Sequence, residues 1–190
     1  PLYDGTFLAR SQDVIVVTAQ YRFGPFGYLD FTQYSTDERT FDSNLGLRDQ
    51  VAALTWVQRN IAAFGGDPDN VTVFGESAGG SAVLSLLSAP SAKGLFTKAI
   101  AESPAPALVI GKRSADIFAD EFLRILQDPD RRGTAERTDE PIPADTAAAL
   151  LDSASARELH VAGRRLMSFA RHSSVGEPVP FGPVVDGSYL

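Results

Sequence analysis

The chain has 190 residues, 44% of them hydrophobic and 22% charged, which is enough to bury one sizeable core. Its formal net charge is −7 and no basic stripe interleaved with aromatic residues is present, so nucleic acid is not an expected partner. No apolar run approaches the roughly 20 residues that cross a bilayer. Without cysteine, the chain can form neither a disulfide nor a thiolate metal site.

The first predicted element is a strand at Val14–Val17. This run is β-branched and shows no polar alternation, which is typical of a strand covered on both faces of a parallel sheet. A turn-rich segment and a polar loop follow over residues 20–43. Residues 44–63 then predict a helix with Asn44 as its cap, and Trp56 is expected in the core as part of its apolar stripe.

Two further strand predictions flank a second helix. Residues 71–75 and 98–102 are short apolar runs, and between them a helix is predicted from Ser77 to about Ala89. Strands that alternate with helices predict right-handed crossovers in a mostly parallel central sheet. The fold class is therefore α/β.

Beyond Pro104 the pattern changes to helices. A helix is predicted at 113–127 and a second helical stretch at 144–170, and a charged link at 128–143 connects them. We interpret the whole chain, 1–190, as part of one domain. Residues 1–104 are expected to form the sheet core, and 105–190 a helical insertion or lid.

The stretch VTVFGESAGG, residues 71–80, is the most informative motif. Its Gly-x-Ser-x-Gly pattern around Ser77 is that of a nucleophile elbow, a strand-to-helix turn that strains the serine and exposes its oxygen. Glycines at 75, 79 and 80 would let strand and helix approach closely. A tight glycine turn with an incidental serine is the alternative, and the apolar strand and helix on either side favour the elbow.

Four segments of the chain resemble the type B carboxylesterases, the carboxylesterase and cholinesterase family of α/β-hydrolases. They are QYRFGPFGYLD, the block from Asn44 to Gly80, GLFTKAIAES and PFGPVVDG. The resemblance implies a partial α/β-hydrolase fold that hydrolyses carboxylic esters through a serine acyl-enzyme, with a small-molecule ester as substrate and no cofactor. One departure is AESPAP, where the family more usually has Gln-Ser-Gly after the strand, and it affects Ser103 and the packing behind the nucleophile.

The resemblance also implies roles for individual residues. Ser77 matches the nucleophile, and the backbone N–H of Ala78 matches a donor of the oxyanion hole. Glu76 matches an acidic residue that supports the site from beside the nucleophile; the alternative is a solvated surface carboxylate. Arg22 and Asp49 match a structural ion pair, and two separate solvated charges are the alternative.

A serine nucleophile needs a histidine base and a carboxylate that orients it. The two histidines, His160 and His172, lie in a helical stretch with only one predicted strand between them and the elbow, so neither is expected to be the base. The resemblance implies that the chain is an internal fragment, inactive alone, with the acid, the histidine and the upstream oxyanion loop outside it. No metal cluster or dinucleotide motif is present in the sequence.

Other interpretations remain open at this point. A cholinesterase-like structural or adhesion domain is the main alternative from another class, and a lipase or peptidase could use the same fold. The sequence does not decide between a soluble bacterial cytoplasmic protein and a secreted one, and the oligomeric state is not determined.

Overall fold

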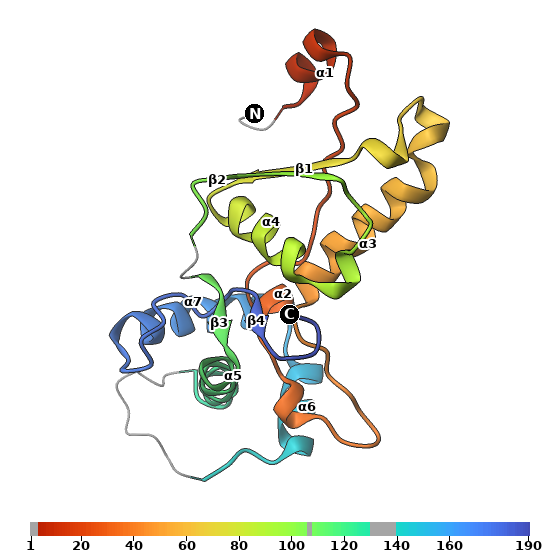
Figure 1. Cartoon of the computed structure of the whole chain (residues 1–190). Helices are drawn as coiled ribbons and strands as arrows, with labels where there is room; N and C mark the ends of the chain where they lie inside the picture. The colour runs from red at the N-terminus through yellow and green to blue at the C-terminus, as the bar shows by residue number, and fades with distance from the viewer. Residues whose placement is uncertain (1–3, 106–107, 130–139) are drawn as a thin grey trace.

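The computed structural model describes residues 4–105, 108–129 and 140–190 (Figure 1). The helices are α1 Thr6–Gln12, α2 Pro25–Tyr28, α3 Leu45–Asn60, α4 Ala78–Ser88, α5 Lys112–Gln127, α6 Ala144–Ser153 and α7 Ala156–His172. The strands are β1 Thr72–Glu76, β2 Lys98–Glu102, β3 Ile110–Gly111 and β4 Val184–Val185. In Figure 1, α3 and α4 lie beside the β1–β2 pair, and α5, α6 and α7 gather around β3 and β4.

Strands β1 and β2 are parallel and pair from Thr72 opposite Lys98 to Glu76 opposite Glu102. Helix α4 connects them and packs against both strands, and Val83 of this helix is buried. The parallel strand–helix–strand order predicted from the sequence is confirmed here, with the first strand shifted by one residue. A second parallel pair joins β3 to β4.

The strand predicted at Val14–Val17 is wrong. The structure has no regular secondary structure at this segment, no backbone hydrogen bond joins it to a strand anywhere in the described part of the chain, and Val14 and Val17 are 45% and 46% exposed. The segment lines a cavity of about 720 Å³ that Val73 and Phe74 of β1 also line. Apolar β-branched residues favour an extended backbone, but a strand also needs a neighbour that accepts and donates its backbone hydrogen bonds.

One face of the β1–β2 pair is uncovered by the described residues. Phe74 and Ile100 lie opposite each other in register and are 60% and 50% exposed. Trp56 is also exposed, at 47%, with its ring 5.8 Å from that of Phe64, so the prediction that it lies in the core is wrong. It directly precedes the buried Val57, and one residue along a helix rotates a side chain by about 100°.

Asn44 precedes α3 as predicted, but its side chain does not cap the helix. Its backbone is left-handed, with φ 56°. Its side chain donates from Nδ2 to the Val184 carbonyl oxygen at 3.0 Å and accepts from the Val184 N–H at 2.7 Å. The buried amide therefore pairs with β4 as a neighbouring strand residue would.

Asp186 continues this connection between the start of α3 and the end of the chain. One carboxylate oxygen accepts from the Ser43 hydroxyl and from Asn44 Nδ2, and the other accepts from the backbone N–H groups of residues 188–190. Burial raises the pKa of the Asp186 carboxyl, but the hydrogen bonds from Ser43 and from these backbone groups outweigh it and hold the pKa well below its usual range.

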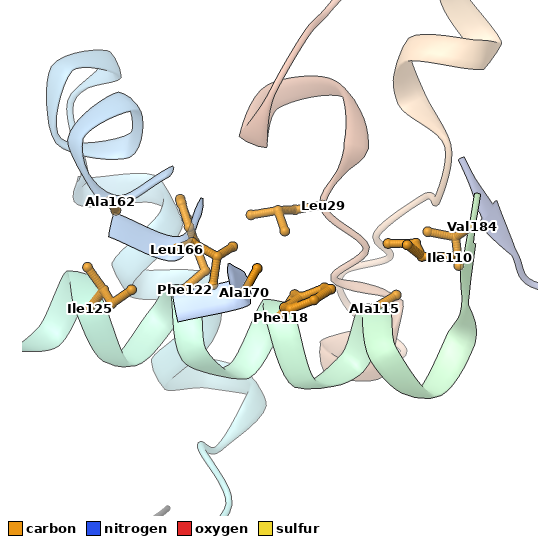
Figure 2. Packing of buried hydrophobic residues seen from close by; sticks show 10 residues of the cluster. All are labelled: Leu29, Ile110, Ala115, Phe118, Phe122, Ile125, Ala162, Leu166, Ala170 and Val184. Atoms are coloured by element: carbon orange, nitrogen blue, oxygen red, sulfur yellow. The ribbon is translucent and has the colours of Figure 1, made fainter. Parts of the chain in front are cut away.

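The largest core lies between helices α5 and α7 (Figure 2). Phe118 and Phe122 of α5 and Leu166 of α7 are almost fully buried, and Leu29 reaches the same cluster from the amino-terminal part of the chain. The helix predicted at 113–127 is present as α5. The stretch predicted at 144–170 is two helices, because Ser155 begins α7 with a capping box to Glu158.

Most of the link predicted at 128–143 lies outside the described residues. Leu29 and Tyr34 share their cores with α5, so residues on either side of position 104 are packed together. The division of the chain at that position stays a prediction. No helix among the described residues is both long and apolar enough to span a membrane.

Arg22 and Asp49 form an ion pair between the segment before α2 and helix α3. The guanidinium donates from Nη2 at 2.7 Å and from Nε at 2.9 Å, and the Arg22 backbone N–H donates to the same carboxylate at 2.9 Å. The hydrogen bond from Arg22 lowers the pKa of Asp49, and the same bond raises the pKa of Arg22. The two side chains are 48% and 26% exposed, so the pair is only partly desolvated.

Replacing Asp186 with asparagine should lower the free energy of unfolding by about 1–3 kcal/mol at pH 7, because the amide presents one acceptor oxygen where the carboxylate presents two. The pKa of Asp186 is lower in the folded chain than in the unfolded chain. Its contribution is therefore complete above the unfolded pKa of about 4 and declines as the pH falls below it. Urea unfolding should show a smaller difference between wild type and Asp186→Asn at pH 3 than at pH 7.

The control for this prediction is Asp42→Asn, which alters a carboxylate that is 69% exposed and paired with Arg48. It should cost less than about 1 kcal/mol. Equal losses in the free energy of unfolding of the two variants would show that the hydrogen bonds of Asp186 contribute no more than an exposed ion pair.

Removing either partner of the Arg22–Asp49 pair should cost about 1 kcal/mol, because solvent screens a pair whose arginine is half exposed. A double-mutant cycle with Arg22→Ala and Asp49→Ala measures their coupling free energy. The coupling should be favourable at low salt and weaker at 1 M salt, whereas strictly additive losses would show that the pair contributes nothing.

Candidate active site

Ser77 is the single residue between strand β1 and helix α4. Its backbone has φ 55° and ψ −114°, a conformation that a residue with a side chain rarely adopts. Such a conformation costs on the order of 1–3 kcal/mol and persists only where the surrounding structure enforces it. The strained strand-to-helix turn expected from the sequence is therefore present at Ser77.

Both backbone groups of Ser77 are held by hydrogen bonds. Its N–H donates to the carbonyl oxygen of Glu102 at 3.0 Å, and its own carbonyl oxygen accepts from the Ser81 N–H at 3.0 Å. Glu102 is the last residue of β2, opposite Glu76 in the parallel ladder. The neighbouring strand and the first turn of α4 thus hold the turn from both sides.

Glycines at 75 and 80 allow the close approach of strand and helix. A Cβ atom on Gly75 would lie 2.5 Å from the carbonyl carbon of Gly79, and one on Gly80 would lie 2.7 Å from the carbonyl oxygen of Glu102. A Cβ atom on Gly79 would meet nothing within 4 Å. Three glycines were expected to permit this approach. The positions of Gly75 and Gly80 have no room for a Cβ atom, whereas the position of Gly79 has room for one.

The serine and the first residue of α4 both lie at the surface. Ser77 and Ala78 are both exposed. The Ala78 N–H is the first in α4, and no acceptor for it is present among the described residues. A free N–H at the positive end of a helix dipole is suited to stabilise negative charge on a nearby oxygen.

Glu76 is exposed, and no described residue forms a hydrogen bond or ion pair with its side chain. In this structure it therefore matches the solvated carboxylate that the sequence left open as the alternative. Its supporting role beside the nucleophile stays a prediction.

The two histidines lie on α7, which packs against α5 and α2. His160 is exposed, and His172 lies at the last turn with its Nδ1 atom 2.7 Å from the Ser168 carbonyl oxygen. A histidine at the carboxyl end of a helix interacts favourably with the helix dipole. Within the described ranges, no hydrogen bond connects the Ser77 hydroxyl to a histidine or a carboxylate.

The residues that the structure describes contain no group of three or more histidine, aspartate or glutamate side chains that could hold a metal ion.

The sequence model of the carboxylesterase family matches residues 1–190. The chain belongs to the carboxylesterase family. Para-nitrobenzyl esterase from Bacillus subtilis is 55% identical over 126 residues, which is 66% of this chain and 25% of that protein. Liver carboxylesterase from Sus scrofa is 53% identical over 103 residues, or 54% of this chain and 17% of that protein.

Solved carboxylesterase structures share the fold of the whole chain. A PNB esterase structure superposes with a TM-score of 0.80 at 41% identity, covering 100% of this chain and 36% of that one. A carboxylesterase from Geobacillus stearothermophilus gives a TM-score of 0.77 at 40% identity, over 99% and 34%. The chain thus has part of the α/β-hydrolase fold and spans about a third of the length of these esterases.

The sequence did not identify how the loop after β2 contacts the elbow of this carboxylesterase chain. Ser103 has φ 43°, and the buried Ser81 contacts Ala105 through its hydroxyl. The departure AESPAP was a signal that this loop differs from the family pattern. Ser81 could also have been identified from the sequence, since it lies four residues after Ser77, one helical turn further along the same face.

Gly75→Ala and Gly80→Ala should each lower the melting temperature or the soluble yield markedly, because the added Cβ atom would overlap backbone atoms that cannot move away. Gly79→Ala should leave both close to wild type, because the space beside it is open. Thermal unfolding of the three variants in parallel is the measurement. A Gly75→Ala variant as stable as Gly79→Ala would show that strand and helix are not in close contact.

Proposed function

We propose that this chain carries the nucleophile of a serine carboxylesterase, with Ser77 attacking the carbonyl carbon of carboxylic esters. The observation that carries the proposal is the strained, exposed Ser77 at the turn from β1 to α4 in a chain of the carboxylesterase family. Strain of this kind is retained where it contributes to function. An adhesion or structural domain would have no need of an exposed serine in this conformation.

The proposed reaction proceeds through two tetrahedral intermediates. Ser77 Oγ attacks the ester carbonyl carbon and loses its proton to a general base, and the alcohol then leaves with a proton. Water hydrolyses the resulting acyl-enzyme and releases the carboxylic acid. The negative charge that develops on the substrate oxygen in each step would be stabilised by the Ala78 N–H, and each such donor is worth about 3–4 kcal/mol.

The general base and the acid that orients it are proposed to come from the part of the family's length that this chain does not span. The histidines of α7 are poor candidates, because His172 contacts a carbonyl oxygen of its own helix and His160 is an exposed residue near the amino-terminal end of α7. The 190-residue chain alone is accordingly expected to be inactive, since serine without a base is a weak nucleophile.

The proposed substrate class is a small carboxylic ester. Similar proteins carry names that include para-nitrobenzyl esterase, cocaine esterase and bile salt-activated lipase. Two of these names state an esterase and one states a lipase.

Ser77→Ala should reduce p-nitrophenyl ester hydrolysis by at least about a thousandfold in the polypeptide that carries this sequence, because it removes the nucleophile. The melting temperature should change little, since alanine is smaller than serine. Ser88→Ala is the matched control: it removes an exposed hydroxyl that bonds to the Leu84 carbonyl oxygen of the same helix, and it should retain full activity. Retention of more than a few per cent of wild-type activity by Ser77→Ala would exclude Ser77 as the nucleophile.

A further inference from the structure

Ser81 is a buried polar residue in the first turns of α4, only 3% exposed. Its hydroxyl oxygen accepts from the Ala105 N–H at 2.9 Å. It lies 3.0 Å from the Ala105 carbonyl oxygen and 3.2 Å from that of Ser77, and its single hydrogen can be donated to either. One side chain thus connects the elbow to the loop after β2.

That loop is attached to the elbow at two points. Glu102 accepts the Ser77 N–H, and three residues later Ala105 donates to Ser81. Between these points Ser103 has φ 43°, and Pro104 has no N–H to contribute. Because Pro104 has no N–H, the next backbone donor after Ser103 is that of Ala105, and the hydroxyl of Ser81 accepts from it.

The contact of Ser81 with the Ser77 carbonyl oxygen also determines the direction of the Ala78 N–H. The Ser77 carbonyl and the Ala78 N–H belong to one planar trans peptide, so they point in opposite directions. The N–H and the hydroxyl of Ser81 both lie against that carbonyl oxygen, at 3.0 and 3.2 Å. When the carbonyl is held along the helix, the Ala78 N–H is held pointing out of its amino-terminal end.

We propose that Ser81 is a positioning residue for the esterase reaction, fixing the Ser77–Ala78 peptide so that its N–H is directed at the developing oxyanion. This inference rests on the proposed function of Ser77. Donors of this kind act on the transition state, so their orientation should affect kcat more than KM. A residue that only stabilised the helix would change the melting temperature and leave kcat of the folded enzyme unaltered.

The kinetic test compares Ser81→Ala with Ser85→Ala in the polypeptide that carries this sequence. Ser85 is equally buried, and its hydroxyl donates to the Ser81 carbonyl oxygen at 3.0 Å without contacting the loop. Ser81→Ala should lower kcat about five- to tenfold with KM within about twofold of wild type, and Ser85→Ala should alter neither by more than about twofold. Equal effects of the two variants on kcat would overturn the proposal.

A second pair of variants separates the effect of the Ser81 hydroxyl group from the effect of side-chain shape. Threonine and valine have nearly the same shape, so Ser81→Thr should keep most of kcat while Ser81→Val behaves like Ser81→Ala. If the two variants have the same kcat, the hydroxyl does not position the peptide.

Amide hydrogen exchange tests the attachment of the loop without depending on activity. The Ala105 N–H should exchange about as slowly as the Ser81 N–H, since each is held in a hydrogen bond, the first to the hydroxyl of the buried Ser81 and the second to the Ser77 carbonyl oxygen. Rapid exchange at Ala105 would overturn the attachment itself. Slow exchange with an active Ser77→Ala variant would instead show that the proposed nucleophile is wrong.

Discussion

The hydrogen bond from the Ser77 N–H to the Glu102 carbonyl oxygen is the contact on which the geometry of the site depends. It extends the parallel ladder of β1 and β2 by one step into a turn that serine would not adopt alone. Gly75 and Gly80 bring α4 close enough for this bond to form, and the first turn of the helix holds the carbonyl of Ser77. The exposed hydroxyl and the free N–H of Ala78 are consequences of that arrangement.

The rest of the chain supports this arrangement through polar contacts between distant segments. Asn44 pairs with both backbone groups of Val184, and Asp186 accepts hydrogen bonds from Ser43 and from the last residues of the chain. These contacts join the start of α3 to β4, and β4 joins the helical core through β3. The helix that packs beside α4 is thereby connected to the α5–α7 core.

Elements with a strong local pattern could be predicted from the sequence. The strands at β1 and β2, the helices α3, α4 and α5 and the serine turn follow from apolar spacing and glycine placement. The errors concern properties that depend on distant partners. Val14–Val17 pairs with no strand among the described residues, and Asn44 bonds to a residue 140 positions away. Strands β3 and β4 have two residues each, too few for any periodicity to show.

We propose that the activation of Ser77 as a nucleophile requires partners beyond these 190 residues. The most direct measurement is labelling with a fluorophosphonate probe, which reacts with activated serines, followed by mass spectrometry of the modified peptide. We expect one adduct per polypeptide, on Ser77, in the full-length polypeptide that carries this sequence, and none on the 190-residue chain alone. An adduct on another serine would contradict the assignment of Ser77, and rapid labelling of the chain alone would contradict the requirement for outside partners.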